Sequence, residues 1–329
     1  MIATITLNPC LDEHITVNGL VVEEVNRWSR LRRSAGGKGI GVSRAIHEMD
    51  GRAIAYGFIG GSEGRALEIL LDEEGVQFSF TPIEQGTRTN IIITDTKTSQ
   101  QTKIDARGPR ILKKELERFY RKVRGVYPGP DLIVASGSIP PGVPLNIYHN
   151  IAMEAKKYKV RTILDSEGQW LAEGIKAKPY LIKPNIHEAE ELLKRKLPTE
   201  EAIIKAALDL VRTGIEVVAI SRGRYGIIAA TKKNIVKAVP PPVKVRSALG
   251  AGDCTTAGLA LKLAYNEPLI EACRLGVAMG TAAVLTPGTE LCRRADVENL
   301  LPQIKVVEIT TRQRRKVFFP ADNESSPPD

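Results

Sequence analysis

The sequence predicts an α/β fold of three layers, αβα, in which helices cover both faces of a doubly wound, mostly parallel β-sheet. Apolar, β-rich runs alternate with segments of helical period along most of the 329 residues, which is the pattern of β-α-β units. Several runs are almost wholly apolar, such as residues 132–135, as expected for strands buried on both faces. A hydrophobic content of 43% is enough for a large core.

The individual elements follow from the same two periods. Short β-rich runs predict strands at residues 2–7, 53–59, 90–94, 132–136, 161–165, 180–183, 216–221 and 227–231. Apolar residues at helical spacing predict helices at residues 39–49, 64–74, 113–123, 145–157, 187–194, 200–213, 252–264 and 269–285.

Two stretches break this alternation. Residues 13–33 and 85–103 alternate polar and apolar side chains and carry no helix signals, as in the run from His14 to Val17. We expect them to contribute antiparallel strands to a small second sheet beside the main one. Such a sheet can close over a site as a lid or pair between subunits.

Composition disfavours several other classes of protein. No apolar run is long enough to cross a membrane, and the first residues do not resemble a secretory signal, so we expect a cytoplasmic protein. The cysteines lack metal-binding spacing and are expected to be free thiols: Cys10, Cys254, Cys273 and Cys292. The net charge of +9 suits anionic substrates.

The C-terminal residues have a composition of their own. Residues 311–329 are basic at first and then rich in Pro and Ser, and residues 323–329 are expected to be disordered. A basic tail can bind nucleic acid, and such binding would collapse with salt. We do not expect it, because the groove-reading motifs of nucleic-acid-binding proteins are absent.

The segment 247–258 carries the strongest chemical signal. Glycines and small residues lead directly into an apolar helix, so backbone N–H groups and the positive helix end can converge on one anion. Gly250, Ala251 and Gly252 would form this anion hole. Asp253, in the first helical turn, could accept the proton of an attacking hydroxyl. The alternative is that Asp253 only caps the helix.

Two more segments have ligand-binding character and a structural alternative each. In 34–45, glycines surround Lys38 before a helix, but the spacing is not that of a P-loop; the alternative is a tight turn with a solvated lysine. In 183–188, Asn185 and Glu188 could bind Mg²⁺ through water. The alternative, stronger for this segment alone, is a capping box at a helix start.

Two turns complete the set. Residues 136–142 form a rigid turn after a buried strand, where ligands bind in doubly wound folds. Residues 221–226 predict a hairpin turn that can also contact nucleotide phosphates. Both could instead be ordinary turns.

These five segments, in this order and at these distances, resemble the ribokinase-like sugar kinases of the phosphofructokinase-B group. The resemblance covers residues 2–304. Residues 8–12 are similar to the family's opening strand, residues 36–39 to its first signature, and Asp253 falls on the base of its second. Residues 240–244 and 287–292 resemble its 6-phosphofructokinase branch, and residues 24–27 its 1-phosphofructokinase and tagatose-6-phosphate kinase branches.

The resemblance implies an ATP-dependent kinase domain at residues 1–310 that phosphorylates a phosphorylated ketohexose, with fructose 6-phosphate the first expectation. The substrate-binding residues would be Asp12, Gly36, Gly37, Lys38, Arg88 and Ser138, with Arg88 on the phosphate. The ATP-binding residues would be Lys183, Asn185, Ser221, Gly223 and Gly226. Mg²⁺ would lie near Asn185 and Glu188, and K⁺ near Ser247, Leu249, Ala283, Thr286 and Gly288. Family members often form homodimers through the lid.

Three departures from the family pattern affect the substrate more than the chemistry. Gly41 stands where the family has a sugar-contacting Asn, and loss of that amide should cost on the order of 1–3 kcal/mol of binding. Arg222 replaces an apolar residue near the nucleotide. Asp105 opens a segment, 105–108, that lacks the family's Asn-Glu pattern.

Several functions therefore stay open. One is a 1-phosphofructokinase or tagatose-6-phosphate kinase, and another is a kinase of an unphosphorylated sugar or nucleoside. A third, prompted by Gly41, is a sugar-phosphate-binding protein without catalysis.

Overall fold

An eleven-stranded sheet forms the middle layer of the computed structural model, which describes residues 1–310 apart from 128 and 289. The predicted tail at residues 311–329 lies outside these residues. The strand order is β15 (Lys305–Thr310), β14 (Asn234–Val239), β13 (Ile227–Ala230), β12 (Val217–Ser221), β11 (Leu181–Ile182), β10 (Arg161–Asp165), β9 (Leu132–Ser136), β1 (Ile2–Thr6), β4 (Ala53–Ile59) and β5 (Gln77–Phe78). Strand β6 (Thr81–Pro82) pairs with β4 in parallel, after β5.

The sheet is mostly parallel, as the sequence predicts. All pairs from β5 to β12 are parallel, and β13, β14 and β15 are added in antiparallel fashion at one edge. Because parallel strands point the same way, the loops that follow β1, β9, β10 and β11 open at one edge of the sheet, where ligands bind in such folds.

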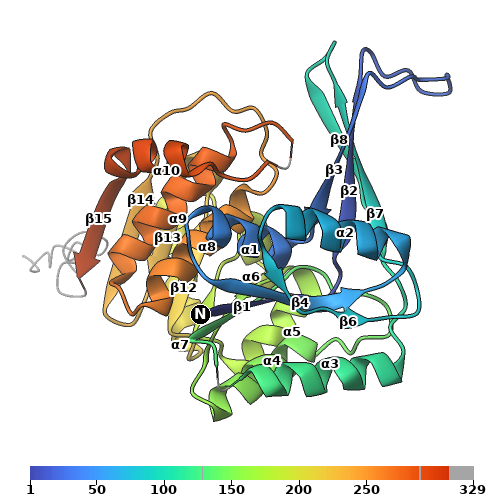
Figure 1. Cartoon of the computed structure of the whole chain (residues 1–329). Helices are drawn as coiled ribbons and strands as arrows, with labels where there is room; N and C mark the ends of the chain where they lie inside the picture. The colour runs from blue at the N-terminus through green and yellow to red at the C-terminus, as the bar shows by residue number, and fades with distance from the viewer. Residues whose placement is uncertain (128, 289, 311–329) are drawn as a thin grey trace, which may run out of the picture.

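Helices cover both faces (Figure 1). One face packs against α3 (Lys113–Val126), α4 (Ile147–Lys157), α5 (Gly168–Gly174), α6 (Ile186–Leu193) and α7 (Glu200–Arg212). The other packs against α1 (Lys38–Glu48), α2 (Gly61–Glu73), α8 (Ala251–Ala264), α9 (Leu269–Ala283) and α10 (Arg294–Leu300).

Strand β9 shows why the middle strands are apolar throughout. Leu132 and Val134 belong to the core under α8 and α9, whereas Ile133 and Ala135 belong to the core under α4 and α7. Successive side chains point to opposite faces of a strand, and both faces are buried here. The continuous apolar run is therefore a consequence of the three layers.

A four-stranded sheet projects from one edge of the main body as a lid (Figure 1). Its order is β3 (Arg30–Gly36), β2 (Cys10–Val17), β7 (Arg88–Asp95) and β8 (Gln100–Ile104). The expectation of purely antiparallel strands is wrong for the central pair, because β2 and β7 are parallel. Both leave the same edge of the main sheet, β2 after β1 and β7 after β6, so they run in the same direction.

Short 3₁₀ helices connect some of these elements, at Ile175–Ala177, Gly223–Tyr225 and Leu301–Gln303. In the described part of the chain, no helix has the length and hydropathy that crossing a bilayer requires.

Candidate active site

Two cavities meet at the start of α8. The first, of about 250 Å³, is enclosed by the loop after β1, the start of α1, the lid and the start of α8. The second, of about 700 Å³, lies between the β12–β13 turn, residues 240–245, α8 and α9. Gly250 and Asp253 line the first cavity, whereas Ala251 and Gly252 line the second. The predicted anion-hole turn therefore separates two chambers.

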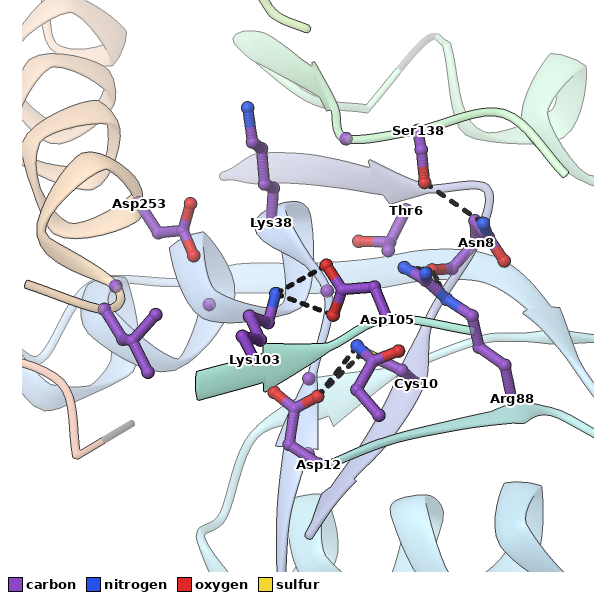
Figure 2. A pocket seen from close by; sticks show the side chains of 18 of the residues that line it. Thr6, Asn8, Cys10, Asp12, Lys38, Arg88, Lys103, Asp105, Ser138 and Asp253 are labelled. Carbon is purple, nitrogen blue, oxygen red and sulfur yellow. Dashed lines mark hydrogen bonds and ion pairs between the residues drawn. The ribbon is translucent and has the colours of Figure 1, made fainter. Parts of the chain in front are cut away.

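Asp253 lies in the first turn of α8 with its carboxylate in the first cavity (Figure 2). Desolvation by the surrounding protein and the negative charge of Asp165 raise the pKa of Asp253 to about 7, although Lys38 and Lys183 act in the opposite direction. A general base works best when its pKa is close to the operating pH. The geometry and the pKa thus both suit proton transfer.

Asp165, at the end of β10, holds two lysines near this turn. Its carboxylate lies 3.2 Å from Nζ of Lys183 and 3.7 Å from Nζ of Lys38, and it accepts a 2.7 Å hydrogen bond from Oγ1 of Thr256. Burial acts to raise the pKa of Asp165, but the two lysines outweigh it and lower that pKa. Asp165 therefore stays ionised and orients both ammonium groups.

Both ammonium groups lie where a polyphosphate could pass between the cavities. Nζ of Lys183 is 3.8 Å from the position that a Cβ on Gly252 would occupy. Nζ of Lys38 is 3.8 Å from Glu188 as well as close to Asp165. Burial lowers the pKa of Lys38, but the two carboxylates raise it by more, so this lysine stays charged.

The segment at 183–188 adopts the capping box that the sequence offered as the stronger alternative. Oδ1 of Asn185 accepts from the N–H of Glu188 at 2.8 Å, and Oε2 of Glu188 accepts from the N–H of Asn185 at 2.9 Å. Oε1 of Glu188 is the atom that faces Lys38. Among the described residues, no group of three or more His, Cys, Asp or Glu side chains could enclose a metal. This donor set fits a Mg²⁺ bound mainly by phosphate oxygens and water.

The first cavity collects every residue predicted for the sugar. It is lined by Asp12, Gly36, Gly37, Lys38, Arg88 and Ser138, together with Arg44 and Lys103, which carry no functional signal in the sequence (Figure 2). Oδ1 of Asp12 accepts hydrogen bonds from Nδ2 of Asn90 at 3.0 Å and from Sγ of Cys10 at 3.2 Å. Oγ1 of Thr6 and Oδ1 of Asn8 line or border this cavity and have no hydrogen-bond partner within the described residues. Buried polar atoms of this kind favour a polar ligand.

Arg88 is less available than the sequence suggests. Its guanidinium donates from Nε and Nη2 to the carbonyl oxygen of Asn8, at 3.3 and 3.0 Å, and from Nη1 to that of Ala106 at 2.7 Å. Three of the five N–H groups of a guanidinium are thus used, two on the loop after β1 and one on the segment that follows β8.

Gly41, the first departure from the family pattern, lies directly against Asp253. A Cβ at this position would be 2.5 Å from Oδ2 and 3.1 Å from Cβ of Asp253. In this structure, position 41 therefore has no room for a side chain unless Asp253 moves.

The second cavity collects the residues predicted for the nucleotide from 221–226. Ser221, Gly223 and Gly226 line it, and they form the predicted turn between the antiparallel strands β12 and β13. Its other walls are mostly apolar, from Pro240, Pro241, Pro242, Val243, Val245, Val277 and Val284. Arg222 is not among the lining residues, and its guanidinium pairs with Glu200 at 2.8 Å. This departure therefore serves a structural ion pair.

The residues predicted for a monovalent cation lie around the end of α9. Val284 O accepts from the N–H groups of Arg246 and Ser247, at 2.8 and 3.5 Å, which brings 247–249 beside that helix end. Oγ1 of Thr286 donates to Ala283 O at 2.8 Å. Carbonyl and hydroxyl oxygens of this kind suit a hard cation.

Comparison with known proteins agrees with this geometry. A family model described as pfkB family carbohydrate kinase matches residues 5–296. The chain is 34% identical to 1-phosphofructokinase of Bacillus subtilis, covering 94% of this chain and 100% of that protein. It is 33% identical to ATP-dependent 6-phosphofructokinase isozyme 2 of Mycobacterium tuberculosis (99% and 96% covered) and 34% identical to tagatose-6-phosphate kinase of Staphylococcus epidermidis (94% and 100% covered).

Solved structures agree as well. The crystal structure of phosphofructokinase-2 from Escherichia coli in complex with potassium superposes with a TM-score of 0.88 at 33% identity, covering 92% of this chain and 98% of that one. A tetrameric inhibited form of the same Escherichia coli enzyme gives a TM-score of 0.86 at 32% identity over the same shares.

Proposed function

The chain belongs to the pfkB family of carbohydrate kinases and is an ATP-dependent phosphotransferase, and on that premise we propose that its acceptor is a phosphorylated ketohexose, with fructose 6-phosphate first. The observation that carries the proposal is the position of Asp253. It faces a sugar-sized cavity lined with charged side chains and directly follows Gly252, which lines the nucleotide-sized cavity.

The proposed chemistry assigns one task to each group around the turn. Asp253 accepts the proton of the attacking primary hydroxyl. The N–H groups of residues 250–252 and the positive end of α8 stabilise the transferring phosphoryl group. Lys38 and Lys183 neutralise charge on the polyphosphate. Glu188 and Asn185 would hold, through water, a Mg²⁺ that would supply further charge neutralisation on ATP.

The choice of a phosphorylated acceptor rests on charge and on the relatives. The first cavity is lined by charges of both signs, with Lys38, Arg44, Arg88 and Lys103 beside Asp12, Asp105, Glu167 and Asp253. Its cationic groups can attract an anionic substituent of the acceptor. The three similar enzymes are a 1-phosphofructokinase, a 6-phosphofructokinase and a tagatose-6-phosphate kinase. A 1-phosphofructokinase or tagatose-6-phosphate kinase is therefore the second candidate.

A coupled assay tests the proposal with fructose 6-phosphate, fructose 1-phosphate and tagatose 6-phosphate against fructose, ribose and adenosine. We expect turnover with at least one phosphosugar and a kcat/KM at least about tenfold higher than for the unphosphorylated acceptors, a difference of about 1.4 kcal/mol. Turnover only with the unphosphorylated compounds would reject the proposed acceptor class. Binding of a phosphosugar without turnover would favour a non-catalytic binding protein.

Two further properties are proposed with the function. K⁺ is assigned to the oxygens around Ser247 and Thr286, supported by the potassium complex of the Escherichia coli enzyme. A homodimer is assigned to the lid, because large apolar side chains are exposed on its β2–β3 connection and such patches mark interaction sites.

A further inference from the structure

The lid carries a lysine, Lys103, that none of the predicted roles includes. It lies in β8 opposite Ile92 of β7 and lines the first cavity. Its Nζ is 3.0 Å from the carboxylate of Asp105, which also lines the cavity (Figure 2). Asp105 opens the segment in which the sequence departs from the family pattern. Both members of this ion pair therefore face the space proposed for the sugar.

The other cations of the cavity are committed to protein partners. Arg44 forms a two-bond ion pair with Glu74, at 2.5 and 2.7 Å, and also donates to the carbonyl oxygen of Ala35 at 3.1 Å. Arg88 uses three of its N–H groups on backbone carbonyls. Lys38 lies between Asp165 and Glu188 on the side of the phosphoryl transfer.

The Lys103–Asp105 pair is different because it is exposed. The side chains are 42% and 49% accessible, and exposed ion pairs contribute little to stability. A phosphate dianion carries more charge than a carboxylate and accepts several strong hydrogen bonds. Lys103 should therefore prefer a phosphate to the carboxylate of Asp105 as its partner.

The backbone directly after Asp105 is held in place by side chains of the cavity. The N–H of Ala106 donates to Oδ1 of Asn90 at 3.1 Å, and Nδ2 of Asn8 donates to the carbonyl oxygen of Arg107 at 3.2 Å. The same Asn90 side chain donates to Asp12. Asp105 therefore borders a fixed stretch of backbone. Lys103, by contrast, has a long and flexible side chain that can change partners.

We propose that Lys103 is a specificity-determining residue that binds the phosphate already present on the acceptor sugar, leaving Asp105 when the phosphosugar enters. This inference rests on the proposed function. Without a phosphate on the acceptor, Lys103 keeps Asp105 as its partner. Asp105 competes with the phosphate for Lys103 and so lowers the affinity of the site for the phosphosugar.

Lys103→Met tests this role, since Met keeps the length of the side chain and removes the charge. We expect the KM for the preferred phosphosugar to rise about 10–100-fold, the effect of losing one charge-assisted hydrogen bond, with an unchanged KM for ATP. The control is Lys97→Met at the lid tip, which lies outside the cavity and should change neither constant. A circular dichroism melt of each variant checks that the lid change leaves the fold intact.

Asp105→Asn is an independent test for which the opposite effect is expected, a gain in phosphosugar binding. The freed lysine should lower the KM for the phosphosugar several-fold, and this gain should disappear in the double variant Lys103→Met/Asp105→Asn. The inference is overturned if Lys103→Met changes the KM for the phosphosugar by less than twofold, or raises the KM for ATP equally. The proposed function is retained in that case as long as the wild-type protein turns over phosphosugars. Wild-type turnover of unphosphorylated acceptors alone overturns both.

Discussion

Asp253, the proposed general base, has an unusual pKa of about 7. Because a general base must be deprotonated, kcat/KM should fall about tenfold per pH unit below pH 7 and level off above it. The second ionisation of a phosphosugar lies near pH 6, so a limb at pH 6 in a pH–rate profile would point to the substrate instead. Asp253→Asn should lower kcat by about 10²–10⁴, and near-full activity of this variant would remove Asp253 from the mechanism.

The same shift has a consequence for stability. The pKa of Asp253 is raised in the folded state from its ordinary value of 3.8 to about 7, so the folded chain binds the extra proton. Stability is then lost as pH rises between these two values. Asp253→Asn should therefore raise Tm relative to wild type at pH 8 and leave it nearly unchanged at pH 4, as measured by thermal unfolding. A lower Tm at pH 8 would contradict this sign.

Gly41 gives a second prediction at the scale of one residue. A methyl group there would meet the carboxylate of Asp253 at 2.5 Å, so Gly41→Ala should displace the base. We expect kcat to fall at least about tenfold, since small misplacements of a catalytic group have effects of this size or more. Steady-state assays with saturating ATP and phosphosugar measure it. Unchanged kcat would show that Asp253 has room to adjust.

Sequence patterns identify some of these residues and not others. Asp253 and Lys38 follow glycine-rich turns, which give a visible signal. Lys103 lies in an alternating edge strand, where a lysine is ordinarily solvated, so only the three-dimensional position reveals it. Asp165 ends a buried strand, but its two lysine partners are 18 residues downstream and far upstream in the chain, beyond any local pattern.

At the scale of elements, α8 and α9 pack through two glycines. A Cβ on Gly258 would lie 2.6 Å from Cα of Gly276, and backbone cannot yield as a side chain can. Gly258→Ala should therefore destabilise the protein by about 1–3 kcal/mol and lower kcat, because α8 carries Asp253. Denaturant unfolding and activity assays measure the two effects.

The chain offers a matched control for this substitution. Gly125 lies in α3, and a Cβ there would meet nothing within 4 Å. Gly125→Ala should stabilise the protein by about 0.5–1 kcal/mol without changing kcat. Equal effects of the two substitutions would contradict the packing argument.

The elements that the sequence predicts best are the buried ones. The predicted helices at 200–213 and 269–285 correspond to α7 (Glu200–Arg212) and α9 (Leu269–Ala283). The sequence does not predict β14 or β15, because Lys237 interrupts the apolar run in β14 and because β15 is an edge strand with a mixed sequence. In the structure, Lys237 pairs with Glu200 at 2.7 Å, which a strand pattern cannot anticipate.

At the scale of the molecule, the lid presents large apolar side chains to solvent. On the connection between β2 and β3, Val22 is 82%, Val25 83% and Trp28 60% accessible. If the lid forms the homodimer, Trp28→Glu should shift the protein from dimer to monomer in analytical ultracentrifugation, since Trp is a frequent hot spot of interfaces. Tyr265→Glu, which changes an exposed aromatic residue at the end of α8, is the control. A wild-type monomer would reject the dimer.

The overall architecture follows from the sequence because apolar residues that recur every two or every 3.6 positions mark the buried faces of strands and helices. The parallel pairing of β2 with β7 does not follow, because it depends on where the strands leave the main sheet. The contact of the lid with the 286–290 connection, through the ion pair of Arg32 with Glu290, is equally invisible in sequence, since the partners are far apart in the chain.

The short turn that separates the two cavities also determines how the reactants can meet. Gly250 faces one chamber and Gly252 the other, so if the sugar and ATP fill them as proposed, the phosphoryl group is transferred directly between the two bound substrates. Initial-rate plots for the two substrates should then intersect rather than run parallel, and a chiral phosphate should arrive with inverted configuration. The phosphoryl group would pass directly from ATP to the sugar beside the start of α8, without a covalent phosphoenzyme intermediate.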